Sequence, residues 1–376
     1  MTVFVHINTF PHGSTGGIMM KEHHELLAAG ENSHAFWGRG RAAEGEHEMR
    51  FATDLEVRLD GLQTRLDGKA GFHSKAATSR LLNRLDELGP DVVHLHNLHG
   101  YYVNVEMLFE WLAAEDCRVE WTLHDCWAFT GHCAYFTYAK CDQWKDCCAN
   151  SKPCTQLDTY PKTFSKASCA WSFEQKKRVF NLVPVDRMRL ITPSQWLADL
   201  VGESFLKDYP VEVRHNTIDV SVFKPTSSDF RVRYGIDDRF MVLGVASPWT
   251  ERKGLSDFVR LAGDLDSDKF AIVLIGLSDK QKREMPAGVV GLGRTDSPKE
   301  LAEAYSTADV FFNPTREDNY PTTLLEAQAC GTDAITYAVG GSGEAIVREG
   351  SCSTTSYEDA LASIKRMCAK GSRGVP

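Results

Sequence analysis

Two carboxylates, Asp318 and Glu326, have seven residues between them at a predicted turn from a loop into a helix. Pro321 suits the first turn of that helix, because the N–H that proline lacks would have no partner there. Gly331 suits its end, in a left-handed conformation. The N–H groups of residues 322–324 would be free and face outward, and together with the helix dipole they would accept a phosphate. Carboxylates beside a phosphate site suit the hydroxyls of a ribose or a sugar, so the segment predicts a nucleotide-sugar site.

Two cations, Arg252 and Lys253, follow the predicted strand 240–246. At the end of a strand they would bind a diphosphate and offset the charge that develops on a leaving nucleoside diphosphate. A solvated surface pair is the alternative. Gly293 and Arg294 follow the apolar pair 289–290, and this turn would pack against a nucleobase or be an ordinary surface turn.

The first half of the chain offers further polar groups at predicted strand ends. We expect residues 13–17 to form a glycine-bearing loop that lets Gly17 approach a phosphate or sugar, or else a plain tight turn. This loop fits neither the Walker motif nor the dinucleotide fingerprint. His124 ends the strand 119–124, where it would bond a sugar hydroxyl or only the backbone. His94 and His96 share one face of a strand, but two histidines fall short of a metal site.

Six of the eleven cysteines fall between residues 126 and 154. Four of them would supply the ligands of a structural zinc ion, although the paired C-x2-C spacing of common zinc modules is absent. Free thiols and disulfides are the alternatives. The ligands that we predict are Cys133, Cys141, Cys147 (or its neighbour Cys148) and Cys154.

The elements that must position these groups alternate between strands and helices. Buried strands at 3–7, 33–37, 91–96, 119–124 and 189–194, and again at 240–246, 271–276, 309–314 and 333–337, are separated by helical patterns. This alternation predicts two doubly wound α/β domains with parallel sheets, residues 1–212 and 213–376, facing each other across a cleft. Ligands of such sheets bind beyond the carboxyl ends of the strands.

Composition narrows the function classes. The 376 residues are 43% hydrophobic and 25% charged, as in a soluble globular protein, and the net charge of -9 argues against a general nucleic-acid binder. No apolar run is long enough to span a bilayer, and the N-terminus lacks a signal-like segment. We therefore expect a cytoplasmic protein.

The assembled motifs resemble the retaining glycosyltransferases of family 4, which have the GT-B fold. The spacing of Asp318 and Glu326 is similar to the E-x7-E motif of that family. The resemblance extends over nearly the whole chain. The segments that match the family, in the family's order, are 91–96, 122–125, 192–194, 216–219, 223–225, 253–254 and 340–344. Residues 121–154 resemble a cysteine-bearing insertion of a subgroup used in bacterial surface-polysaccharide assembly.

The resemblance implies a role for each candidate. Glu326 would bind the ribose and Asp318 the donor sugar. Arg252 and Lys253 would bind the diphosphate with the backbone of Thr323 and Leu324. Gly17 would lie against the diphosphate or the acceptor, His124 against the transferred sugar, and Gly293 and Arg294 beside the base. Asp318 is one methylene shorter than the usual glutamate, a difference for which Glu317 could compensate.

The family transfers sugars without a required metal. We expect a UDP- or GDP-sugar donor and a glycan or lipid-linked acceptor, which would bring the protein to the inner membrane face. The alternatives are another nucleotide-sugar enzyme, such as a 2-epimerase or a phosphorylase, and a non-catalytic nucleotide-sugar binding protein.

Overall fold

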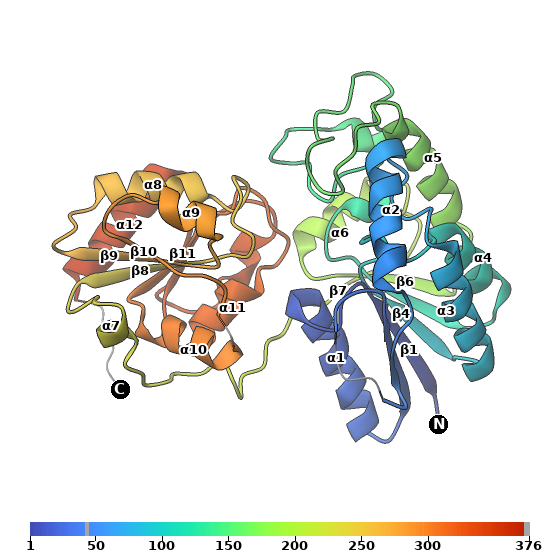
Figure 1. Ribbon diagram of the computed structural model, residues 1–376, viewed down its shortest axis with the longest axis horizontal. Coiled ribbons are helices and arrows are strands. Elements are labelled where there is room, and N and C mark those ends of the chain that lie inside the picture. Colours follow the sequence, from blue (N-terminus) through green and yellow to red (C-terminus); the bar gives the residue numbers. More distant parts are fainter. Residues whose placement is uncertain (42–44, 296, 372–376) are drawn as a thin grey trace. The chain divides into compact units, whose positions relative to one another are not determined.

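The computed structural model describes residues 1–41, 45–295 and 297–371, and the chain divides into two compact units, residues 1–215 and 216–376. Each unit contains one parallel sheet with helices on both of its faces (Figure 1). Both sheets are therefore buried, which explains the nearly continuous apolar runs of their strands.

The first unit has a seven-stranded sheet in the order β3-β2-β1-β4-β5-β6-β7. Its strands are β1 (Val3–Asn8), β2 (Asn32–Trp37), β3 (Glu48–Arg50), β4 (Val92–Leu95), β5 (Arg118–Thr122), β6 (Met188–Thr192) and β7 (Val211–Val213). Its helices are α1 (Gly13–Ala28), α2 (Asp54–Asp67), α3 (Lys75–Leu88), α4 (Val105–Ala114), α5 (Ser168–Phe180) and α6 (Gln195–Gly202), with short 3-10 turns η1 (Trp127–Phe129) and η2 (Gln143–Lys145).

The second unit has a six-stranded sheet in the order β10-β9-β8-β11-β12-β13. Its strands are β8 (Phe240–Val245), β9 (Phe270–Ile275), β10 (Val289–Gly291), β11 (Val310–Asn313), β12 (Ala334–Tyr337) and β13 (Cys352–Thr354). Its helices are α7 (Phe230–Arg233), α8 (Leu255–Asp264), α9 (Asp279–Glu284), α10 (Pro298–Thr307), α11 (Thr322–Ala329) and α12 (Tyr357–Ala369), with the 3-10 turn η3 (Ser342–Ala345).

Both sheets reverse their strand order once. The reversal lies between β1 and β4 in the first unit and between β8 and β11 in the second. Loops that leave adjacent strands at such a point turn to opposite faces of the sheet and leave a crevice between them, which is where ligands of this architecture bind.

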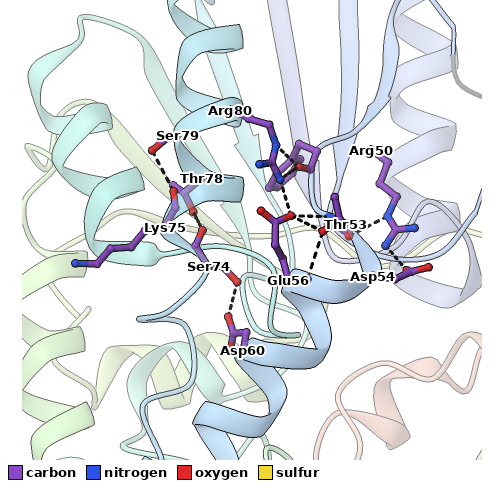
Figure 2. Close-up of polar contacts among 12 residues, drawn as sticks. Arg50, Thr53, Asp54, Glu56, Asp60, Ser74, Lys75, Thr78, Ser79 and Arg80 are labelled. Atoms are coloured by element: carbon purple, nitrogen blue, oxygen red, sulfur yellow. Dashed lines mark hydrogen bonds and ion pairs between the residues drawn. The ribbon is translucent and has the colours of Figure 1, made fainter.

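Helix α2 illustrates how local sequence sets the ends of the helices (Figure 2). Thr53 and Glu56 form a reciprocal capping box at its start. Arg80 of α3 donates to the same Glu56 at 2.6 Å, and Ser74 donates to Asp60 at 2.5 Å. These bonds join α3 and its N-cap residue to α2.

The predicted loop at residues 13–17 is wrong, because α1 already begins at Gly13. Gly17 consequently lies inside the helix. A Cβ at Gly17 would meet nothing within 4 Å, whereas one at Gly16 would lie 2.6 Å from the carbonyl oxygen of Phe10. The close backbone approach that we predicted for Gly17 occurs at Gly16, where the helix passes over the preceding turn.

Candidate functional site

The loops that follow β8 and β11 are joined by backbone contacts at the strand-order reversal of the second unit. Gly254 has a positive φ of 77°, and a Cβ there would lie 2.1 Å from the carbonyl oxygen of Pro314. The N–H of Arg316 donates to the carbonyl of Arg252 at 2.7 Å. Only glycine fits such an approach, so Gly254 fixes the position of the preceding Lys253.

Lys253 forms an ion pair with Asp318, and the two loops thus place a cation beside a buried carboxylate. Burial acts to raise the pKa of Asp318, but Lys253 and Arg252 outweigh it and lower the pKa below its usual value. Asp318 is therefore ionised at neutral pH. Arg252 donates to the carbonyl of the buried Glu317, so its guanidinium also holds the loop that carries Asp318.

The carbonyl of Asp318 is held from its other side by the segment 340–344. A Cβ at Gly340 would lie 2.1 Å from this oxygen, which accepts a hydrogen bond from the N–H of Gly341 at 3.0 Å. The glycines of this motif thus have a packing reason, because they let two loops meet behind the Asp318 carboxylate.

Helix α11 begins at Thr322, so Pro321 precedes its first turn instead of occupying it. Gly331 has a φ of 89° and ends the helix as predicted. The N–H of Leu324 is not free, because it donates to the carbonyl of Pro321 at 3.1 Å. Within the described part of the chain, the N–H groups of Thr322 and Thr323 have no acceptor. The predicted set of three free donors is therefore reduced to two.

Glu326 lies one turn further along α11. It accepts a hydrogen bond of 3.0 Å from the hydroxyl of Tyr305, a residue of α10 that is fully buried. Burial raises the pKa of Glu326 to about 7, although the hydrogen bonds from Tyr305 and Thr322 act to lower it. Glu326 is thus a carboxylate that hydrogen-bond donors of a ligand would stabilise in its charged form.

Gly293 and Arg294 follow β10, at the carboxyl end of the same sheet. The carbonyl of Gly293 accepts a hydrogen bond of 3.0 Å from the N–H of Gly276, which follows β9. A Cβ at Gly276 would lie 2.0 Å from the carbonyl oxygen of Ala246. Three adjacent strand ends are thus joined through backbone.

In the first unit, His124 follows β5 and contacts a second histidine. Its Nε2 lies 3.2 Å from Nδ1 of His96, and the two rings stack with centroids 5.4 Å apart. Burial lowers the pKa of His124 to about 4, although Asp125 and Glu22 act to raise it. The imidazole is therefore neutral at physiological pH and can donate from one nitrogen while accepting at the other.

The cysteine-rich segment is ordered by an aromatic cluster in which Trp144 packs on Phe136 and Phe129, with ring centroids 4.7 and 5.4 Å apart. Burial raises the pKa of the Cys133 thiol, and the neighbouring thiols of Cys148, Cys154 and Cys141 raise it further. Cys147 instead lies against Glu174, so Cys148 is the better fourth candidate.

Zinc at these thiols stays a prediction. Among the residues placed by the structure, two groups of three or more candidate ligand side chains have ligand atoms within 4.8 Å of one another. Neither group contains a cysteine.

Lys176 also approaches the cysteine-rich segment. It donates to the carbonyls of Trp127 and Thr130 at 2.8 and 3.0 Å, and burial lowers its pKa to about 7.

Several of these contacts were not predicted from the sequence. Tyr305 and Lys176 lie in ordinary helical patterns, and no motif marked either of them. Gly254 and Gly340 were recognised only as parts of motifs. A glycine next to a functional lysine or carboxylate is a signal of close backbone packing, which could have identified both positions.

Comparison with known proteins identifies similar chains. Residues 239–369 match the family model described as glycosyl transferases group 1. The putative colanic acid biosynthesis glycosyl transferase WcaC of Escherichia coli K12 is 25% identical over 379 aligned positions, which cover 93% of this chain and 86% of that protein.

Solved structures share the fold. Sucrose-phosphate synthase from Thermosynechococcus elongatus superposes with a TM-score of 0.69 at 13% identity, covering 98% of this chain and 90% of that one. HepE from Anabaena, solved in complex with UDP-glucose, gives a TM-score of 0.62 at 12% identity, covering 99% and 91%. Of the helices that the structure describes, none has the length and apolar character needed to cross a membrane.

Proposed function

Since this chain is a group 1 glycosyltransferase of the retaining family 4 with the GT-B fold, we propose that it moves a sugar from a nucleotide-diphosphate-sugar to a glycan or lipid-linked acceptor. The similarity to a protein named for colanic acid biosynthesis supports a role in the synthesis of a surface polysaccharide or another glycoconjugate. In this proposal residues 213–376 bind the donor and residues 1–212 receive the acceptor.

One observation supports the donor site above the others. The paired Lys253 and Asp318 lie at the strand-order reversal of the second unit, and Asp318 stands four residues before the free N–H groups at the start of α11. A cation and helix N–H groups suit a diphosphate. The adjacent buried carboxylate suits a sugar hydroxyl.

The proposed reaction breaks the bond between the anomeric carbon of the sugar and the diphosphate oxygen. The electron pair leaves with the nucleoside diphosphate, a new bond forms between the anomeric carbon and an acceptor oxygen, and the proton of the acceptor hydroxyl passes to the departing diphosphate. Lys253 and Arg252 would lower the barrier by offsetting the negative charge that grows on the leaving diphosphate.

The remaining residues would orient the donor. Glu326 would accept hydrogen bonds from the ribose hydroxyls, because donated hydrogen bonds compensate the cost of its buried charge. Gly293 and Arg294 would border the base. In the first unit, the neutral His124 would contact the transferred sugar, and the start of α1 near Gly17 would lie against the diphosphate or the acceptor.

We propose a uridine nucleotide as the donor base, with guanosine as the alternative. The support is the likeness to HepE, which was solved with UDP-glucose. That likeness is one of fold, so the base must be measured directly.

A thermal-shift screen against uridine, guanosine and adenosine diphosphates and their sugars tests the proposal. A ligand that binds only the folded protein raises the melting temperature by an amount that grows with its concentration. We expect one base to give a shift with both the diphosphate and at least one sugar conjugate. No shift with any nucleotide would refute the proposal, and free epimer formed from the donor without an acceptor would indicate an epimerase.

A further inference from the structure

A group of imidazoles lies at the strand-order reversal of the first unit. Along β1, Val5 and Ile7 belong to the apolar core while the intervening His6 points to the opposite face, as alternation in a strand requires. In β4, Val93 and Leu95 repeat the pattern, and His94 is the direct neighbour of His6. The second face thus carries histidines where a buried parallel sheet usually carries aliphatic side chains.

Helix α1 covers this face and contributes a carboxylate. Oε2 of Glu22 lies 3.1 Å from Nδ1 of His94 and 3.8 Å from Nε2 of His96. One ligand atom from each of Glu22, His6, His94 and His96 lies within 4.8 Å of all the others. Ligands of a tetrahedral zinc ion, about 2.0–2.2 Å from the metal, are roughly 3.4 Å apart, so the two measured distances bracket the spacing that zinc requires.

The other contacts of these rings leave the matching atoms available. Nε2 of His94 bonds the hydroxyl of Thr122 at 2.8 Å, which leaves Nδ1 toward Glu22. Nδ1 of His96 bonds His124, which leaves Nε2. Among the residues described, Nε2 of His96 and both ring nitrogens of His6 are buried without a hydrogen-bond partner.

Such unpaired buried nitrogens are costly. A buried polar group without a partner has lost its hydrogen bonds to water and gained none in return, and His6 is only 2% exposed and His96 only 1%. Burial, followed by the neighbouring histidines, lowers the pKa of both residues well below the usual range, so both rings are in the neutral form that binds metals.

We propose that His6, Glu22, His94 and His96 form a closed site for one divalent ion of the zinc type. Three imidazoles and one carboxylate complete four-coordination without an open position, which is the pattern of a structural site. The ion would join β1, α1 and β4 at the point where the loops of the first sheet diverge.

The site would also orient His124. When Nε2 of His96 binds the ion, its Nδ1 must carry the proton and donate to Nε2 of His124. His124 then holds its own proton on Nδ1. The ion would act on His124 through a hydrogen bond, as outer-shell contacts of metal sites do.

Metal analysis of the purified full-length protein, followed by chelation and reconstitution with Co²⁺, tests the proposal. We expect one equivalent of cobalt bound through nitrogen and oxygen with a four-coordinate visible spectrum, in addition to any cobalt that the cysteines bind. Nitrogen and oxygen ligands will not produce the near-ultraviolet sulfur-to-cobalt band that binding at the cysteines would give. Zn²⁺ added to the stripped wild-type protein should raise its melting temperature, a readout that does not depend on any variant folding.

The variants are Glu22→Gln and His6→Gln, with His34→Gln as the matched control, since His34 is a buried histidine of β2 outside the group. Loss of a ligand should weaken metal binding by more than the roughly 10–100-fold that loss of an outer-shell partner costs, while the control keeps its affinity. Absence of bound metal, a spectrum of sulfur ligands only, or equal weakening in the control would each overturn the proposal.

Discussion

At the scale of single residues, the proposed donor site depends on how the surrounding protein affects the charges of two carboxylates, Asp318 and Glu326. Asp318 keeps its charge because Lys253 and Arg252 oppose the effect of burial. The described partners of Glu326 are the hydroxyls of Tyr305 and Thr322, and burial raises its pKa to about 7. The pKa values of the two carboxylates of one motif are thus shifted in opposite directions, and of the two it is Glu326 that titrates near neutral pH.

Binding of a nucleoside diphosphate should therefore depend on pH through Glu326. A ribose hydroxyl donates to the ionised carboxylate, so binding favours the charged form, and affinity should rise as pH increases through about 7. Glu326→Gln removes this titration while the ligand's own protonation is unchanged. Calorimetry across this range should show an affinity that rises more steeply with pH in the wild type than in the variant, which keeps only the pH dependence of the ligand. Parallel curves would show that Glu326 does not face the ligand.

Lys253 should matter for turnover. Lys253→Ala removes a charge that would offset the leaving diphosphate, and we expect turnover to fall by roughly 10²-fold or more, by analogy with the loss of an oxyanion-hole donor. Lys269→Ala, an exposed lysine of the same unit, is the control. Release of nucleoside diphosphate measures the rate, and near-normal turnover of Lys253→Ala would exclude the role.

At the scale of elements, glycines hold the loops of the second sheet together. Gly254→Ala would place a Cβ 2.1 Å from the carbonyl oxygen of Pro314 at a positive φ. We expect a loss of about 1–3 kcal/mol of stability and weaker donor binding, because Lys253 would move. Gly263→Ala in α8 meets no atom within 4 Å and should be neutral or stabilising by up to about 1 kcal/mol. Thermal unfolding of both variants checks this, and equal stability would contradict the packing argument.

The limits of prediction also lie at this scale. The Asp318–Glu326 spacing and the ending at Gly331 indicated helix α11, because capping and spacing are local properties. The start of α1 was placed five residues too late, because glycines that suggest a loop can be helical when they pack against the preceding turn, as Gly16 does against Phe10. Local sequence could not show which partner lies beneath them.

At the scale of the whole molecule, the alternation of apolar runs and helical patterns was enough to predict two parallel α/β sheets, and the comparisons agree with that fold. Contacts between distant segments were not predictable. His94 and His96 were recognised as sharing a face, but His6 and Glu22 join them only through the pairing of β1 with β4 and the packing of α1. Strand register and helix packing decide such clusters, and neither is written in a local motif.

The central claim is that the second unit binds the nucleotide part of a sugar donor beside α11. Calorimetric titration of uridine and guanosine diphosphates into the wild type and Glu326→Ala, at a pH above 7, tests it most directly. We predict one equivalent bound by the wild type and an affinity about 10–100-fold lower in the variant, as for a lost hydrogen bond to a charged group. Absence of binding by the wild type, or equal affinity in both proteins, would contradict the claim.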